Sequence, residues 1–457
     1  MLASSKDLDE TYNTYKQQDA RDLDPEEARQ VLRKIDVHVL PLLMGTYLLQ
    51  YLDKTSINSA SVFGLKQGTN LHGQQYSWLT SLFYIGYLVA QPVAGYSLQR
   101  LPLGKFIGCT ALVWGLLTIT TPACTNFAGI AANRFLLGVF ESVVNPGFVL
   151  FLSMCLTWGG IFLAFMPDLP STARFLDARQ RIAAVERVAQ NRQGVKNHHF
   201  KTYQMWQCLR DPKTWILFAM SVAAQFTSII LETFGFDVLQ TQYMQIPGNV
   251  IQVVSLLASG YISSRFPNTR CVVMLAGNLV CVAAGGTLVG LPVGPDGTEN
   301  AWGRLVALWL CSFQSVGFSM SLTMVSSNVA GFTKKQLTGA ILFVGYCVGN
   351  VCSSPSHLDR LRLSRSHLAN PAKPAQIIGP QTFIEAEAPH YTILIGYSAK
   401  TLLVVVLYLY MWAVNKKRDR EAAISGAGLT DEQEKEAIER GMQDQTELDN
   451  PGFRYVL

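Results

Sequence analysis

Charged side chains are scarce in this sequence: Asp, Glu, Lys and Arg together make up only 15% of its 457 residues. An ordinary soluble domain carries about 25% charged residues, so this chain has too few charges to cover its surface with solvated groups. Hydrophobic residues, in contrast, reach 49% of the sequence. This balance excludes a nucleic-acid-binding protein and an ordinary cytosolic enzyme, and it favours a large protein of the membrane.

Several motifs that carry chemistry are also absent. The nine cysteines form no C-x-x-C pair, which argues against a zinc site and a redox motif. The apolar composition also excludes a secreted disulfide scaffold. No nucleophile–base set, phosphate-binding loop or metal cluster is found, so we expect neither an enzyme nor a cofactor. The N-terminus is polar and charged, which indicates that there is no cleavable signal peptide and that the first spanning helix directs insertion.

Long apolar runs fill most of the chain between four polar stretches, at 1–36, 167–213, 352–376 and 415–457. A helix needs about 20 mostly apolar residues to cross a bilayer. Ten runs have a suitable length and composition, at 37–57, 76–97, 106–124, 129–154, 214–234, 247–264, 271–292, 304–328, 337–351 and 392–414. The sequence therefore predicts an all-α polytopic membrane protein.

Lysine and arginine gather on one side of these spans. With the N-terminus placed in the cytosol, the cytosolic connections carry nineteen basic residues. The opposite connections, counted over 58–75, 125–128, 235–246, 293–303 and 379–391 and so without the insert 351–376, carry one, Lys66. Cytosolic loops of membrane proteins are enriched in Lys and Arg, so we expect both tails in the cytosol. The stretch 176–190 is expected to form an amphipathic helix on the membrane surface.

The layout divides into two membrane halves joined by a basic loop. We expect a cytosolic N-tail (1–36), an N-terminal half (37–166), a central cytosolic loop (167–213), a C-terminal half (214–414) and a cytosolic C-tail (415–457). This is the plan of the major facilitator superfamily, in which the substrate binds between the halves near mid-membrane.

Ionisable groups at bilayer depth are costly and therefore mark candidate functional residues. The first span ends with Gln50, Asp53 and Lys54. Asp53 and Lys54 are adjacent in the sequence, so their side chains point to different sides of the helix. The alternative to a functional role is that both residues cap the span at the interface. Arg134 and Glu141 in the fourth span are seven residues apart and share one helix face, about 10 Å apart. A carboxylate facing an arginine can alternate between ion-paired and protonated states, as proton coupling requires; the alternative is a structural ion pair.

Other polar residues within the spans are secondary candidates, and each is alternatively a hydrogen-bonding contact between helices: Tyr84, Gln91, Asn145, Gln314, Tyr346 and Asn350. Lys400, in the last predicted span, has no assigned role: it either snorkels to the interface or marks where that span begins.

Several runs resemble fungal permeases of the anion:cation symporter branch of the major facilitator superfamily. They include LLQYLDKTSINSASVFGLKQ, NRFLLGVFESVVNPGFVLFLSM and NVAGFTKKQLTGAILFVGYCVGN. The likeness covers roughly residues 30–420 and points to the allantoate-permease group, with nicotinate permeases nearby. It implies twelve helices and proton-coupled uptake of a small organic anion. It also implies that Asp53, Lys54, Arg134 and Glu141 serve proton coupling and substrate binding.

The chain departs from this family at two places. After Met154 the fifth helix and part of the sixth are missing, so we expect about ten of twelve helices and a truncated N-terminal half. In the C-terminal half, the polar and basic insert 351–376 would lie inside a span. Because such a segment is unfavourable in lipid, we interpret it as a translated intron, and the Met154–Cys155 join as the complementary error of a mis-predicted gene.

The sequence thus predicts a secondary active transporter, a monomer of the plasma membrane that takes up a small organic anion together with a proton. Candidate substrates are allantoate, ureidosuccinate, nicotinate or a similar carboxylate. The alternative is a non-transporting relic or nutrient sensor of the same fold, because helix five is missing.

Overall fold

The computed structural model describes a defined set of residues: 26, 29–39, 41, 71, 75–142, 173, 175–189, 197, 199–225, 238–291, 300–352, 389–424 and 431–457. Four predicted site residues lie outside these ranges, namely Gln50, Asp53, Lys54 and Asn145. The Met154–Cys155 join and nearly all of the insert 351–376 also lie outside them.

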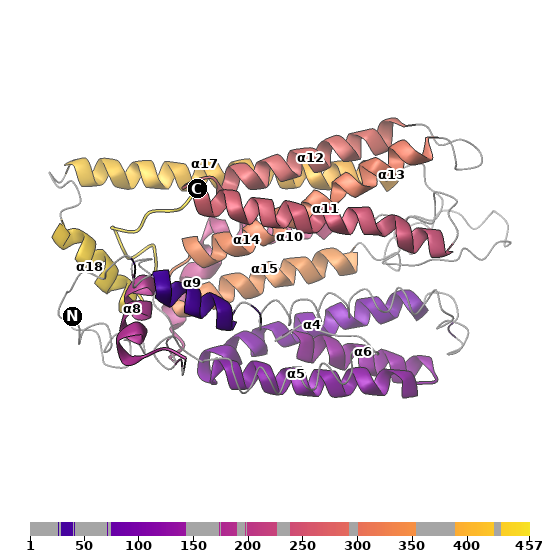
Figure 1. Cartoon of the computed structure of the whole chain (residues 1–457), viewed down its shortest axis with the longest axis horizontal. Coiled ribbons are helices and arrows are strands. Elements are labelled where there is room, and N and C mark those ends of the chain that lie inside the picture. The colour runs from indigo at the N-terminus through magenta and orange to yellow at the C-terminus, as the bar shows by residue number, and fades with distance from the viewer. Residues whose placement is uncertain are drawn as a thin grey trace.

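Most of the long helices run along one direction in a single elongated bundle (Figure 1). Three of them belong to the N-terminal half: α4 (Gln75–Arg100), α5 (Leu103–Thr120) and α6 (Phe127–Glu141). A short 3-10 helix, η2 (Thr121–Ala123), follows α5. Asn126 begins α6, because its side-chain oxygen accepts a hydrogen bond from the Gly129 amide at 2.8 Å and satisfies a free donor of the first turn.

Within its described residues, the C-terminal half contains five continuous helices: α10 (Pro212–Gln225), α11 (Val238–Arg265), α12 (Arg270–Gly290), α15 (Phe332–Cys352) and α17 (Pro389–Ile424). The predicted span 304–328 instead has three parts, α13 (Ala301–Leu310), the 3-10 turn η6 (Cys311–Phe313) and α14 (Gln314–Asn328). The carbonyl of Cys311 accepts hydrogen bonds from the Tyr397 hydroxyl at 3.4 Å and the Cys281 thiol at 3.6 Å. Neighbouring helices thus satisfy a backbone group at the point where the regular helix is interrupted.

Three shorter helices gather at one end of the bundle with the C-terminus, at the left of Figure 1: α8 (Ala178–Ala189), α9 (Thr202–Arg210) and α18 (Asp431–Met442). We call this end of the bundle the tail end. The helix predicted over 176–190 corresponds to α8. Its Ala183 and Ala184 pack with Val31 and Leu176 in a small apolar cluster, so one face is covered by protein.

Each predicted span that falls within the described ranges contains a helix, but several helices are longer than expected. α15 starts at Phe332, before the predicted span 337–351, and α17 continues to Ile424, beyond the predicted end at 414. The additional turns carry charged residues, such as Lys334 in α15 and Arg418 in α17. A hydropathy pattern ends a span where charge begins, whereas the helix itself continues beyond the bilayer.

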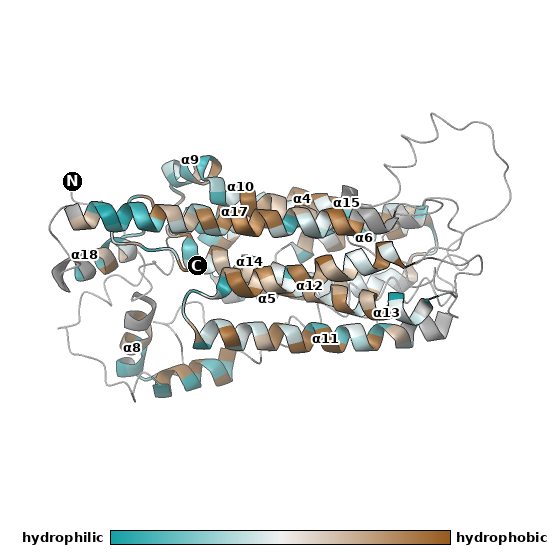
Figure 2. Cartoon of the chain, turned by 90° about the horizontal axis from the view of Figure 1, so that it is seen from above, coloured by the Kyte–Doolittle hydropathy of each residue, from teal (hydrophilic) through white to brown (hydrophobic). Residues whose placement is uncertain are grey.

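Within the described residues, four helical segments are long and apolar enough to cross a membrane: Tyr243–Arg265, Arg270–Gly290, Trp302–Asn328 and Ile393–Ala423. Apolar residues dominate α12 and the middle of α17, whereas the final turns of α17 are hydrophilic (Figure 2). Only 17% of the apolar window in Tyr243–Arg265 is buried inside the protein. Such an apolar, outward-facing surface suits a helix that contacts lipid.

Glycine allows α4 and α6 to approach each other at the backbone. A Cβ added at Gly138 of α6 would collide with the carbonyl of Phe83, and one added at Gly86 of α4 would collide with the carbonyl of Phe135. Small residues at helix interfaces in membranes permit this kind of close packing. This contact holds α6 against α4 on the face of α6 that carries Arg134 and Glu141.

Candidate functional site

Two helices, α4 and α15, form a line of contact between the two halves. Tyr84 of α4 lies edge to face with Tyr346 of α15, with ring centroids 5.9 Å apart. One turn further along α4, Tyr87 lies 6.2 Å from Phe343, centroid to centroid. Residue numbers rise along α4 in the direction in which they fall along α15, so the two helices are antiparallel. The candidate residues Tyr84 and Tyr346 therefore lie together between the halves.

A third helix of the C-terminal half joins this line through an aromatic side chain. Phe318 of α14 packs against Tyr346 at 5.5 Å and against Phe343 at 6.1 Å, centroid to centroid. Gln314, another candidate, lies one turn before Phe318 in the same helix. An aromatic layer therefore connects the inter-half contact with the interior of the C-terminal half.

Arg134 and Glu141 both lie on the buried face of α6, where Arg134 is 9% exposed and Glu141 is 1% exposed. Glu141 lies close enough to Tyr84 and Tyr87 of α4 for its carboxyl group to act on both of them electrostatically. Phe135, the residue after Arg134, packs at Gly86. The two ionisable groups of α6 are thus held beside the helix that meets the C-terminal half.

The remaining candidates are spread along the same helices rather than gathered in one place. Asn350 of α15 donates to the side-chain oxygen of Gln225 in α10 at 3.2 Å and to the carbonyl of Tyr346 at 2.8 Å. Gln91 is buried in α4, two turns from Tyr84 toward the tail end. The contact of Asn350 with Gln225 is a hydrogen bond between helices, which is the alternative role that the sequence left open for this residue.

A buried cation lies between α12, α14 and α17 in the C-terminal half. Lys400 is 1% exposed, and its Nζ lies 3.3 Å from the carbonyl of Gln314. The Nζ of Lys400 and the Oδ1 of Asn278 both lie within 3 Å of the point where a Cβ at Gly317 would stand. Lys400 therefore neither snorkels nor marks the start of its span, and the absence of a side chain at residue 317 makes room for it.

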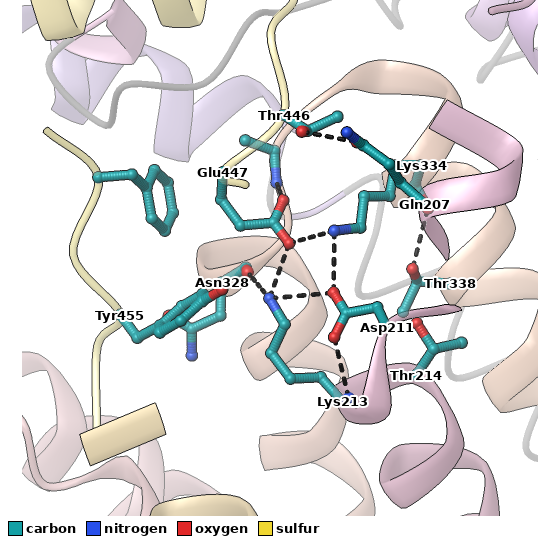
Figure 3. A network of polar contacts seen from close by, with 12 residues as sticks. Gln207, Asp211, Lys213, Thr214, Asn328, Lys334, Thr338, Thr446, Glu447 and Tyr455 are labelled. Carbon is teal, nitrogen blue, oxygen red and sulfur yellow. Dashed lines mark hydrogen bonds and ion pairs between the residues drawn. The ribbon is translucent and has the colours of Figure 1, made fainter. Parts of the chain in front are cut away.

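At the tail end, the C-terminal segment supplies a buried carboxylate to two lysines (Figure 3). The carboxylate of Glu447 pairs with Lys213, at the start of α10, at 2.7 Å, and with Lys334, in the first turn of α15. Asp211 completes the group, 2.8 Å from Lys334 and 3.4 Å from Lys213. All four side chains are at most 2% exposed, and two positive charges balance two negative ones.

Electrostatics keeps this carboxylate ionised. Burial by itself would raise the pKa of Glu447, but the adjacent Lys213 and Lys334 outweigh burial and hold that pKa at about 2. Asp444 behaves differently: burial raises its pKa, although Lys201, at 3.0 Å, and the Phe332 amide favour the ionised form. The tail thus brings one strongly stabilised carboxylate and one more easily protonated carboxylate into the protein.

The sequence alone had missed these tail-end contacts. It treated Lys213 and Lys334 as loop charges that fix orientation, and it did not pair them with an acid. No local pattern joins Lys334 to Glu447, which lie 113 residues apart. One signal could have indicated these contacts: the last part of the chain carries acidic residues, whereas the loops at the tail end of the bundle are basic.

Comparisons with known proteins agree with this architecture. The sequence profile of the Major Facilitator Superfamily matches residues 43–154 and 146–355. An uncharacterized transporter of Schizosaccharomyces pombe is 32% identical over 99% of this chain and 94% of its own length. The allantoate permease of Saccharomyces cerevisiae is 27% identical over 99% of this chain and 91% of its own length. A solved E. coli fucose:proton symporter superposes with a TM-score of 0.50 at 12% identity, covering 81% of this chain and 99% of that chain.

The alignments also bear on the missing helix. The alignment with the Schizosaccharomyces pombe transporter runs over 521 positions, more than the 457 residues of this chain, so that relative carries residues without a counterpart here. The profile match divides into two at residues 146–154, next to the Met154–Cys155 join. These relatives are transporters rather than enzymes, as the sequence predicted. By its profile match, its relatives and its two-half helical bundle, the chain belongs to the major facilitator superfamily.

Proposed function

We propose that this transporter takes up a small organic anion together with a proton. The observation that carries the proposal is the position of Glu141, a carboxyl group 1% exposed beside Tyr84, on the line where the two halves meet. An ionised carboxylate is costly in a site without water unless a cation approaches it. Glu141 can therefore hold a proton during one half of the transport cycle and release it during the other.

Arg134 supplies the complementary charge on the same face of α6. It is buried, and an arginine can bind a carboxylate through two parallel hydrogen bonds. We infer that Arg134, together with Lys54 of the first predicted span, binds the substrate anion, and that Asp53 or Glu141 takes the proton. The name of the allantoate permease supports a substrate with a carboxylate group, such as allantoate, ureidosuccinate or nicotinate.

The orientation follows from the distribution of charge. We propose that the tail end faces the cytosol, because the loops and tails assigned to that side carry nineteen basic residues against one on the other side. We further propose that the protein acts as a monomer in the plasma membrane.

A direct uptake assay tests this proposal. The purified chain is reconstituted into liposomes, and entry of radiolabelled allantoate, ureidosuccinate and nicotinate is measured with competition by the unlabelled compounds. Saturable entry of at least one anion is expected, with little effect of a neutral compound such as allantoin. Inhibition by allantoin as strong as that by allantoate would refute an anion-specific site.

A second candidate function is supported by a different observation, namely that the aligned relatives carry residues that this chain lacks. The chain as written is then a non-transporting relic or nutrient sensor, or the product of a mis-predicted gene. A version with helix five restored is compared in the same uptake assay. Uptake by the chain as written rules out the relic, whereas uptake by the restored version alone supports it. Transcripts that omit the codons for 351–376 support the gene error, and uniform retention of these codons in mature message refutes it.

A further inference from the structure

The C-terminal segment touches three helices of the C-terminal half where they end or begin. We call residues 444–457 the tail clasp. Its Glu447 pairs with Lys213 of α10 and Lys334 of α15, as described above. Near its end, the Val456 amide donates to the Asn328 side chain of α14 at 2.7 Å, and that side chain returns a hydrogen bond to the Val456 carbonyl at 2.9 Å. Phe453 and Tyr455 of the clasp are each 2% exposed and belong to the main apolar core.

The clasp also caps the start of α15. The Phe332 amide donates to the carboxylate of Asp444 at 2.6 Å, and the Ala330 amide donates to that of Glu447 at 2.9 Å. Carboxylates stabilise a helix N-terminus because the first amides lack partners within the helix and carry partial positive charge. The clasp therefore holds the first turn of α15 in place, including Thr333.

Thr333 is one of the groups to which the N-terminal half attaches. Gln99, in the last turn of α4, is 1% exposed and donates to the Thr333 hydroxyl at 2.9 Å. The same amide group of Gln99 donates to the carbonyls of Asn197 at 3.2 Å and His199 at 3.0 Å. One side chain of the N-terminal half thus binds both the start of α15 and the central loop.

The central loop residue in this contact is itself held by the clasp. The side chain of Asn197 donates to the carboxylate of Asp444 at 3.1 Å. Lys201 pairs with the same carboxylate at 3.0 Å, and Gln204 of α9 donates to the carbonyl of Asp444 at 2.8 Å. These three acceptors of Gln99 therefore belong to segments that Asp444 positions.

We propose that the tail clasp stabilises the conformation in which the two halves are closed at the tail end, by building the surface on which Gln99 docks. The clasp is part of the control of transport rather than of the substrate site. When it leaves, Thr333, Asn197 and residues 199–201 lose their fixed positions, and α4 can separate from α15 at this end. Buried ion pairs suit such a reversible contact, since the desolvation cost of their charges offsets much of their attraction.

Two native cysteines report on this conformation. Cys208 of α9 is fully buried, with its sulfur 3.3 Å from the Thr338 hydroxyl of α15, so it lies where the clasp holds α9 on the bundle. Cys347 of α15 is also fully buried, next to Tyr346 in the chain, and lies near Tyr84 and Tyr87 of α4. Reagent that arrives from the tail end reaches Cys347 only when α4 and α15 have separated.

The experiment measures alkylation of both cysteines in membrane vesicles by a membrane-impermeant maleimide, followed peptide by peptide with mass spectrometry. Inside-out vesicles present the tail end to the reagent if the orientation in our proposed function is correct. The wild type is compared with Glu447→Gln and with a matched control, Glu436→Gln, which removes an acid of the same C-terminal region from an exposed pair with Arg440. We expect Glu447→Gln to speed alkylation of both Cys208 and Cys347 at least about fivefold, and the control to match the wild type.

Different results separate the clasp from the orientation. Faster labelling of Cys208 with unchanged labelling of Cys347 would overturn the proposal, because the clasp would then leave without opening the contact between the halves. Unchanged labelling of both cysteines would overturn it as well. Labelling that changes in right-side-out vesicles alone would contradict the orientation while supporting the clasp.

A locked variant keeps the test decisive if Glu447→Gln does not fold. Gln207 of α9 and Asp449 of the clasp meet at the protein surface, with the Gln207 Nε2 atom 3.0 Å from the Asp449 carboxylate. Gln207→Cys with Asp449→Cys, joined by a cleavable bismaleimide, fixes the clasp in place. Labelling of Cys347 from the tail end is expected to slow at least about threefold and to recover on cleavage. An unchanged rate in the locked protein would mean that the clasp is a static support, contrary to the proposal.

Discussion

Gly138 of α6 packs directly against the backbone carbonyl of Phe83 in α4, one turn before Glu141. This contact sets how closely α6 approaches α4, and therefore how Glu141 faces Tyr84 and Tyr87. A side chain at residue 138 has no space unless one of the two helices moves.

We expect Gly138→Val to destabilise the N-terminal half by about 1–3 kcal/mol or more, because overpacking displaces backbone rather than a flexible side chain. Gly95→Val in α4 is the matched control, since nothing lies within 4 Å of a Cβ added there. Thermal unfolding in detergent, followed by tryptophan fluorescence, measures the difference. Equal melting temperatures for the two variants would disprove the close packing.

Glu141→Gln separates coupling from binding. A glutamine keeps the size and polarity of a protonated carboxyl group but cannot exchange a proton. We expect uptake driven by a proton gradient to fall at least about tenfold, while exchange of labelled for unlabelled substrate continues. Ser142→Ala is the control, since the Ser142 hydroxyl donates to the Val139 carbonyl of its own helix. Equal loss of gradient-driven uptake and exchange would argue against a coupling role for Glu141.

Glu447→Ala should weaken docking of the tail clasp strongly, because Asp211 is then the single counter-ion for the buried Lys213 and Lys334 among the described residues. Removing one partner from a buried ion pair costs about 3–5 kcal/mol. Glu436→Ala, in an exposed pair, should cost about 1 kcal/mol at most. Hydrogen–deuterium exchange of residues 444–450 reports the free energy of undocking, and similar protection in both variants would contradict the ion-pair account.

Docking of the clasp should be insensitive to pH near neutrality and fail only in acid. The folded pKa of Glu447 is about 2, below its ordinary value of 4.5, so its stabilising contribution is complete above about pH 4.5 and is lost as the pH falls toward 2. Asp444 has the opposite sign: its pKa is raised in the docked tail, so proton uptake favours docking as the pH falls through its titration. Exchange protection of the tail, corrected for intrinsic rates, should therefore not fall between pH 8 and about pH 5. Loss of protection between pH 7 and pH 5 would contradict this assignment.

The sequence predicted the helices well because each span must satisfy its own backbone and expose apolar side chains to lipid. It also placed Arg134 and Glu141 on one face of a helix, since a spacing of seven residues is two turns. It did not predict that Tyr84 would meet Tyr346, because an interhelical contact depends on how two distant helices pack. The periodicity of a helix shows which residues share one face, but it does not show which neighbouring helix covers that face.

The tail end was the least predictable part for a related reason. Charge counting placed Lys334 outside the membrane, which fits its position at the start of α15. The same counting treats a lysine as solvated, whereas Lys334 is fully buried against Glu447. A return of the C-terminal segment to the bundle leaves no local pattern, because it is a property of three-dimensional packing. Lys400 shows the same limit: hydropathy located it within a span and gave no indication of Gln314 or Asn278 beside it.

Uptake of radiolabelled allantoate into proteoliposomes, with and without an imposed inward proton gradient, measures whether anion uptake is coupled to protons. We predict that the gradient raises the initial rate at least about fivefold, that a protonophore removes the increase, and that Glu141→Gln shows no increase. An allantoate uptake rate that is the same with and without the gradient, and unaffected by the protonophore, would contradict this coupling.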